Sequence, residues 1–171
     1  MTVAEPSVAP DTTAPPVHTR ALVIGTGFSG LGMAIELQQR GVDALVLVGA
    51  DHAPRLWTAL KTWGKPALLT WSCDPRLPSL GFDNEGAGRL ATRHLLDLGH
   101  RRIGVISGFT SHNDRARSRI EGVRQALAQT GLKLRADLLT EQPFNLEGGR
   151  LGLRQLMSAK EPPTAIFCGN D

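Results

Sequence analysis

The sequence lacks several features that would assign its 171 residues to a specialised class of protein. No apolar run approaches the roughly 20 residues of a transmembrane helix, and the N-terminus has no apolar segment typical of a secretory signal. The sequence also lacks a large excess of charge of one sign. Its formal net charge is only +3, which is too small to indicate nucleic-acid binding by itself. These absences favour a soluble cytoplasmic protein.

Metal-binding and redox motifs are also missing from the sequence. Cys73 and Cys168 are its two cysteines, and their separation matches neither a metal-ligand spacing nor a redox motif. We therefore expect both to be buried thiols in a reducing cytoplasm. His94, His100 and His112 likewise lack the spacing of metal ligands. The sequence predicts no metal site and no set of catalytic residues.

Strand-like and helix-like segments alternate along most of the chain. Residues 1–20 are rich in Pro, Ala, Thr and Val without periodicity, which predicts a disordered leader. Beyond it the hydrophobic pattern predicts strands over 21–25, 44–48, 66–71, 80–82, 102–107, 137–141 and 164–168. It predicts helices over 29–40, 53–63, 84–98, 115–129 and 146–158. This alternation predicts an α/β fold with a parallel sheet, divided into a Rossmann-like lobe over 21–100 and a partial second lobe over 101–171.

A glycine-rich turn follows the first predicted strand, with Gly25, Gly27 and Gly30 in the order GTGFSG. Glycines at this spacing permit a tight turn and a close approach of backbone N–H groups to a pyrophosphate at the helix N-terminus. The segment VIGTGFSGLGMAIELQQRGVD resembles the N-terminus of flavin-dependent monooxygenases of the Baeyer–Villiger type, which implies FAD binding. Val48 stands where those enzymes carry an acidic residue for the ribose, and Asp51 follows three residues later. The alternative is a turn without a ligand.

Four further segments carry a second resemblance: VDALVLVGAD, GFDNEGAGRLATRHLLDLGHRRIGVISG, RSRIEGVRQAL and PPTAIFCGND. They resemble the effector-binding domain of lac-repressor-type (LacI/GalR) transcriptional regulators, a periplasmic-binding-protein-like fold, over residues 42–171. That family extends its second lobe beyond the point matched by residue 171, so we expect an incomplete cleft and self-association through the incomplete lobe. No helix-turn-helix pattern precedes the matched segments, so DNA binding is not expected.

The second resemblance implies a set of ligand-binding residues. Arg119, in RSRIEG, matches an arginine that holds a sugar hydroxyl or an acidic group, and Phe144 matches an aromatic that packs against the ligand ring. Asn170, followed by Asp171, matches an amide that bonds hydroxyl groups. Without the resemblance, Arg119 would be interpreted as an exposed residue near the start of a helix, and Phe144 as a core residue. Asn170 and Asp171 would then be interpreted as a frayed C-terminus.

Other residues are weaker candidates by the same resemblance. Asn113 and Arg115 share the loop before the helix that carries Arg119, at positions where the family varies. Asp83 and Asn84 match the place where the chain passes between the two lobes.

Together, the two resemblances meet at RGVDALVLV and suggest an α/β chimera of natural or constructed origin. Residues 21–41 of this chimera would then be of flavin type and residues 42–171 of repressor type. The expected function is non-catalytic binding of a small polar ligand, such as a sugar or nucleoside, with no cofactor required. The alternative from another class is an FAD- or nucleotide-binding fragment of an oxidoreductase. A scaffold without a ligand is the third possibility.

Overall fold

The structure is a computed structural model that describes residues 44–170 and the backbone of residues 21–24. The predicted leader, the predicted helix over 29–40, the three glycines of the first turn and Asp171 lie outside the described residues. Its strands are β1 (Ala21–Ile24), β2 (Ala44–Val48), β3 (Ala67–Thr70), β4 (Ser79–Leu80), β5 (Ile103–Ser107), β6 (Leu139–Glu141) and β7 (Ala165–Cys168). Its helices are α2 (Pro54–Trp63), α3 (Asn84–Asp97), α4 (Asp114–Ala128) and α5 (Leu146–Met157), with a 3-10 turn η1 (Ala136–Leu138).

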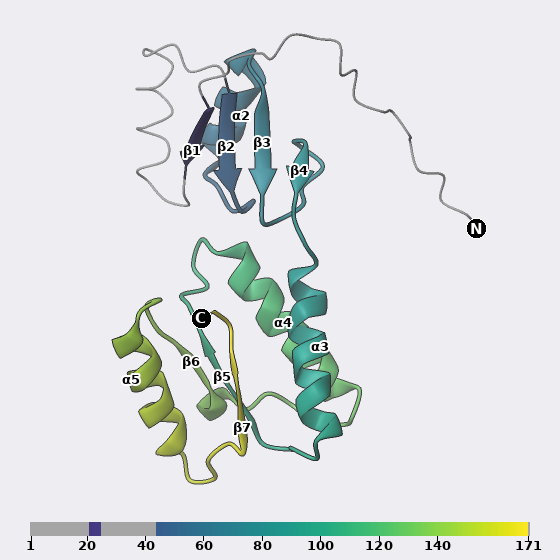
Figure 1. The fold of residues 1–171 in the computed structure, drawn as a ribbon, viewed down its shortest axis with the longest axis vertical. Coiled ribbons are helices and arrows are strands. Elements are labelled where there is room, and N and C mark those ends of the chain that lie inside the picture. Colours follow the sequence, from purple (N-terminus) through teal and green to yellow (C-terminus); the bar gives the residue numbers. More distant parts are fainter. Residues whose placement is uncertain (1–20, 25–43, 171) are drawn as a thin grey trace, which may run out of the picture.

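The described strands form two parallel sheets, one above the other in Figure 1. The first has the order β1-β2-β3-β4 and the second the order β6-β5-β7. All pairings are parallel, so the α/β class is confirmed, although the strands divide between two sheets. Strand β1 pairs with β2 in register from Ala21 opposite Ala44 to Ile24 opposite Leu47. Strand β1 therefore continues the sheet of the strands that follow it, in the parallel orientation predicted.

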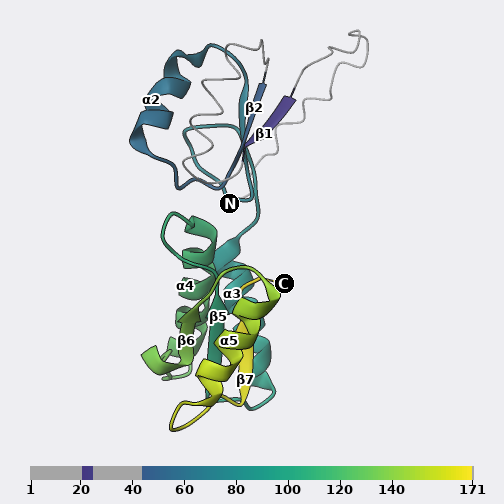
Figure 2. The ribbon, with the colours of Figure 1, turned by 90° about the vertical axis from the view of Figure 1, so that its left-hand side faces the viewer.

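The first lobe comprises β1–β4 and α2. Helix α2 begins with Pro54, whose fixed φ suits the first helical position, and ends at Gly64, whose φ of 66° is left-handed. It covers one side of the sheet (Figure 2). Its Leu56 joins Leu47 and Leu69 in a buried apolar cluster. This cluster packs α2 against β2 and β3 and so fixes the positions of the ends of these two strands.

The second lobe comprises α3–β7. In Figure 1 its sheet lies between α5 on one side and α3 with α4 on the other. Helices α3 and α4 approach so closely that a Cβ on Gly88 would collide with the carbonyl oxygen of Arg119. A Cβ on Gly122 would likewise collide with the carbonyl oxygen of Glu85. Glycine at these two positions allows the backbones to touch.

The boundary between the lobes differs from the one predicted at residue 100. Helix α3 packs against α4 and β7, so it belongs to the second lobe. The chain crosses between the lobes at residues 81–83, just before α3. An amphipathic pattern shows that a helix has a buried face but does not identify its packing partner, and this explains the difference.

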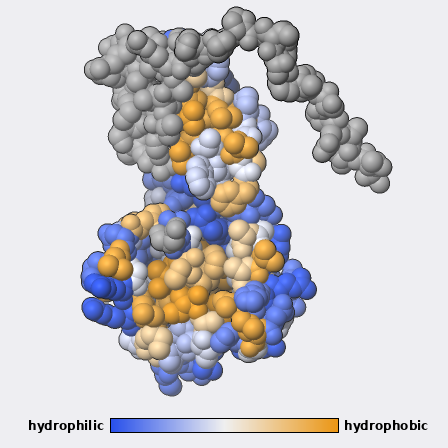
Figure 3. Space-filling view, viewed as in Figure 1, coloured by the Kyte–Doolittle hydropathy of each residue, from blue (hydrophilic) through white to orange (hydrophobic). Residues whose placement is uncertain are grey.

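The prediction that both cysteines are buried is wrong, because Cys73 and Cys168 are exposed. Cys73 lies in the loop after β3, and Cys168 ends β7, which has a neighbour on one side only among the described strands. Figure 3 shows apolar surface in the middle of the second lobe, between α5 and α3. The expected self-association through this lobe stays a prediction. Among residues 44–170, no helix is long and apolar enough to cross a bilayer.

Candidate functional site

The first turn of α4 lies against the carboxyl ends of β2 and β3, where the two lobes meet (Figure 1). Ligands of α/β proteins typically bind at the carboxyl ends of parallel strands. We call the residues that touch here the lobe interface. They are Gly49, Ala50, Asp51 and Ser72 of the first lobe and Asp114, Arg115 and Arg117 of the second.

Asp114 is at the centre of the lobe interface. Its Oδ2 accepts hydrogen bonds from the backbone N–H of Ala50 at 3.0 Å and from the hydroxyl of Ser72 at 2.6 Å. Burial by itself would raise the pKa of this carboxyl. The donors Ser72 and Ala50, with the nearby charge of Arg115, hold that pKa below its ordinary value. Asp114 is therefore an ionised side chain bound to the ends of two strands of the first lobe.

Two arginines complete the lobe interface. Arg117 forms an ion pair with Asp51 at 2.6 Å and also donates to the carbonyl of Thr110 at 2.5 Å. The Arg115 guanidinium contacts Gly49, where a Cβ would collide with its Nη1. Gly49 also has a φ of 74°, so two independent constraints favour glycine there. Arg115 thus contacts the first lobe rather than an open cavity.

Arg119, the strongest predicted ligand residue, belongs to a polar chain that runs between the lobes. Its Nη1 donates to Oδ1 of buried Asn84 at 2.5 Å. The Asn84 amide in turn donates to the carbonyl of Trp71 at 2.9 Å, at the end of β3. Burial, followed by the charge of Arg115, lowers the pKa of Arg119. Its Nε is buried and has no hydrogen-bond partner among the described residues.

Trp71 is notable for its backbone. Its φ of 67° is left-handed, a conformation that is uncommon for residues other than glycine and often occurs at functional sites. Its exposed indole packs edge-on against the ring of Phe82, with 5.9 Å between centroids. The hydrogen bond from Asn84 stabilises this conformation, so the strained residue and Arg119 share one partner.

The remaining predicted residues are distributed along the same edge of the second lobe. Phe144 follows β6 and is 54% exposed, so the core alternative does not hold. Its ring covers Gly108, at the end of β5, where a Cβ would collide with it. Asn170 follows β7 and is exposed. Asn113 caps α4 by accepting from the N–H of Ala116 at 3.2 Å, a structural role that its sequence position already suits.

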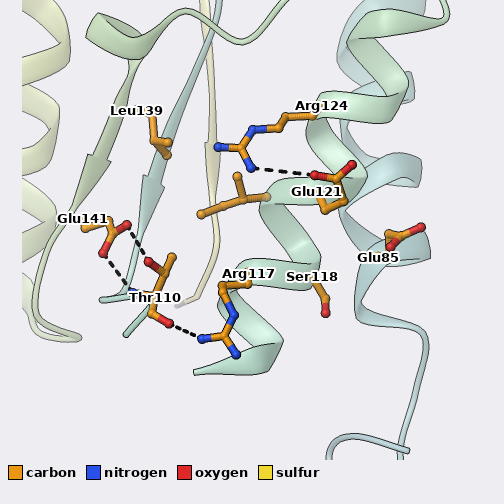
Figure 4. Close-up of a pocket in the computed structure, with 9 residues that line it drawn as sticks. Glu85, Thr110, Arg117, Ser118, Glu121, Arg124, Leu139 and Glu141 are labelled. Carbon is orange, nitrogen blue, oxygen red and sulfur yellow. Dashed lines mark hydrogen bonds and ion pairs between the residues drawn. The ribbon is translucent and has the colours of Figure 1, made fainter. Parts of the chain in front are cut away.

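A separate groove of about 430 Å³ lies beside α4 (Figure 4). Several of its charged groups already have partners: Glu141 accepts from both the N–H and the hydroxyl of Thr110, and Arg124 pairs with Glu121 at 3.7 Å. Arg117 lines this groove and reaches the lobe interface as well. Within the part of the chain that the structure describes, no cluster of His, Cys, Asp and Glu fits a metal ion.

Comparison with known proteins identifies a family over most of the chain. The family model described as periplasmic binding proteins and sugar binding domain of LacI family matches residues 32–171. The ribose operon repressor of Haemophilus influenzae is 39% identical over 136 residues, 79% of this chain and 41% of the relative. The repressor PurR of Photobacterium profundum is 31% identical over 138 residues, with the same coverage. The chain therefore spans about two fifths of the length of these relatives.

Solved structures agree with this match. The transcription regulator GntR from Chromobacterium violaceum has a TM-score of 0.74 at 28% identity, covering 81% of this chain and 51% of that one. A complex of the transcriptional regulator CelR with cellobiose has a TM-score of 0.70 at 26% identity, covering 84% of this chain and 45% of that one. Both agree with the α/β arrangement of the described residues.

These matches do not support the flavin-type part of the predicted chimera. The family model begins at residue 32, inside the segment 21–41 that the flavin resemblance claimed. A strand, a glycine-containing turn and a helix followed by an apolar parallel strand form a common opening of α/β domains. A resemblance limited to such a unit therefore discriminates poorly between unrelated families.

Proposed function

Because the chain belongs to the family of periplasmic binding proteins and LacI-type sugar-binding domains, we propose that it is a ligand-binding domain fragment that takes a sugar-like molecule between its lobes. One observation carries this proposal above the others. Arg119 is held at the junction of the lobes by Asn84 and keeps a buried Nε without a partner among the described residues. A buried donor without an acceptor is costly, and a ligand hydroxyl would satisfy it.

The other predicted residues fit the same ligand chemistry. The Phe144 ring is exposed at the end of β6 and offers an apolar face to a sugar ring. Asn170, after β7, offers an amide that both donates and accepts hydrogen bonds with hydroxyl groups. Helix α4 and the segments after β6 and β7 would thus contribute one arginine, one aromatic ring and one amide. This combination favours a polar ring over an apolar ligand.

The relatives suggest the biological setting. Their names describe repressors of transcription, and the CelR structure is described as a cellobiose complex. We propose that this chain contributes effector recognition to such regulation and performs no catalysis. DNA binding is not part of this proposal.

Thermal unfolding with a panel of sugars and nucleosides tests the proposal. At 100 times its Kd, a ligand that binds only the folded state stabilises it by about 2.7 kcal/mol, so at least one compound should raise the Tm. Arg119→Ala should abolish that shift. Arg124→Ala is the matched control on the same helix, because Arg124 is 53% exposed and forms a surface pair with Glu121. A panel without any stabilising compound, or an unchanged shift in Arg119→Ala, would contradict the proposal.

FAD binding at Gly25, Gly27 and Gly30 is the second candidate. The parallel pairing of β1 with β2 favours it, because this pairing sets the glycine-rich segment directly after a strand. Val48 offers no acceptor for a ribose, and Asp51 is already paired with Arg117. Quenching of FAD fluorescence by the protein would support this candidate, and unchanged fluorescence would remove it.

A further inference from the structure

Two contacts of the lobe interface are made by charged side chains, and they differ in how far those side chains are buried. The Asp114 carboxylate is 20% exposed, and its partner Ser72 is buried. The pair formed by Arg117 and Asp51 is more open, with side chains 48% and 27% exposed. Exposed ion pairs contribute little to stability, whereas a partly buried carboxylate depends strongly on its hydrogen-bond donors. Asp114 is therefore the contact on which the interface depends most.

The position of Asp114 links three separate parts of the chain. The residue lies in the first turn of α4, in the second lobe. Its donors come from two loops of the first lobe, the N–H of Ala50 after β2 and the hydroxyl of Ser72 after β3. A single carboxylate thus bonds the carboxyl ends of two neighbouring strands across the boundary between the lobes.

The same two donors lie where a bound ligand would meet the first lobe. Ala50 and Ser72 follow the carboxyl ends of β2 and β3, the usual ligand-binding edge of a parallel sheet. Because both donate to Asp114, neither is available to a second acceptor in the same geometry. A ligand that uses them has to displace the carboxylate.

We propose that Asp114 is an internal latch, which holds the two lobes together without ligand and has to be released when a ligand reaches Ala50 and Ser72. The consequence for ligand binding rests on the proposed function, but the latch itself does not. The ligand group that replaces Asp114 is a hydrogen-bond acceptor, such as a hydroxyl or carboxylate oxygen. The contact between the lobes is thus regulated by competition between the Asp114 carboxylate and the ligand for the same two donors.

Hydrogen exchange of the ligand-free protein tests the latch directly. In the wild type, the Ala50 amide is bonded to Asp114 and should exchange slowly. In Asp114→Ala, its protection should fall by at least about tenfold, the factor that corresponds to about 1.4 kcal/mol. Ser72→Ala removes one of the two donors and should loosen the contact less. Unchanged protection of Ala50 in Asp114→Ala would overturn the proposal.

A matched control separates the latch from general loosening of the first lobe. Asp74 is a carboxylate in the loop after β3 that bonds only to nearby Arg76 among the described residues. Asp74→Ala should leave the protection of Ala50 unchanged, and an equal loss there would also overturn the proposal. In every variant, the amides of buried β5 should stay protected, which verifies that the second lobe is folded. Sugar-induced thermal shifts test the proposed function separately, so either inference can fail alone.

Discussion

The two lobes contribute different chemistry to the place where they meet. Apart from the Asp51 carboxylate, the first lobe presents backbone and small groups there, namely Gly49, the N–H of Ala50 and the hydroxyl of Ser72. The second presents long charged side chains from one helix, led by Arg115 and Arg119. All of the described residues that the repressor resemblance assigned to ligand binding belong to the second lobe. The repressor motifs identify side chains, so they do not reveal contacts that the first lobe makes through the N–H of Ala50.

The lobes also differ in the cores that position these groups. Among the described residues, four buried side chains form the apolar cluster of the first lobe and seven form that of the second. The second cluster joins the inner faces of α3 and α4 to β5, whereas the first joins α2 to β2 and β3. We therefore expect the second lobe to be the more stable unit, with the lobe interface as the link between them.

The largest expected effect comes from removing a core leucine of either lobe. Leu69 is fully buried in the first lobe and Leu127 is 2% exposed in the second. Replacement of either by alanine should cost about 2–5 kcal/mol. Hydrogen exchange should then show loss of protection confined to the lobe that carries the change. Loss spread equally over both lobes would show a single cooperative unit and contradict the comparison.

A smaller effect is expected from adding one methyl group between α3 and α4. In Gly122→Ala the new Cβ meets the backbone of α3, which cannot move as a flexible side chain can. Overpacking of this kind costs about 1–3 kcal/mol, and a lower Tm should accompany it. Gly149→Ala in α5 is the matched control, since beyond its chain neighbours and its own helix backbone none of the described residues lies within 4 Å of the place its methyl group would take, and alanine favours a helix. A lower Tm in both variants would argue against close contact of α3 and α4.

The smallest expected effect is a pH dependence confined to the first lobe. Burial lowers the pKa of His52, outweighing its hydrogen bond with Gly49 and the nearby carboxylates of Asp114 and Asp51. The unfolded chain therefore binds a proton more readily, and the stability from neutral His52 is lost as the pH falls below about 6.5. Tm values at about pH 7.5 and pH 5 should differ more for the wild type than for His52→Gln.

An exposed histidine of the second lobe controls for this measurement. His94 lies on the exposed side of α3, so His94→Gln should keep the wild-type difference in Tm. The same loss of pH dependence in both variants would show that burial of His52 is not its cause.

Much of the fold could be predicted from local pattern. The run ALVLV predicts β2 at its observed bounds, and Gly64 and Gly99 end their helices with left-handed φ angles. These features depend on apolar spacing and on the backbone freedom of glycine, which neighbouring residues in the sequence already show. The site was predicted less well. Arg119 and Phe144 lie at the expected edge of the second lobe, but Asp114 was missed because it precedes the predicted helix over 115–129, and its sequence position does not show that Ala50 and Ser72 are its partners.

The amino-acid sequence alone determined which segments are strands and helices, the parallel α/β class and the family, because periodicity and motif spacing are local properties. Only the tertiary structure decided that α3 packs with the second lobe and that a single carboxylate bonds the ends of two strands in the first. Ala50, Ser72 and Asp114 are far apart in the chain, and their hydrogen bonds depend on a meeting of the lobes that no local pattern records.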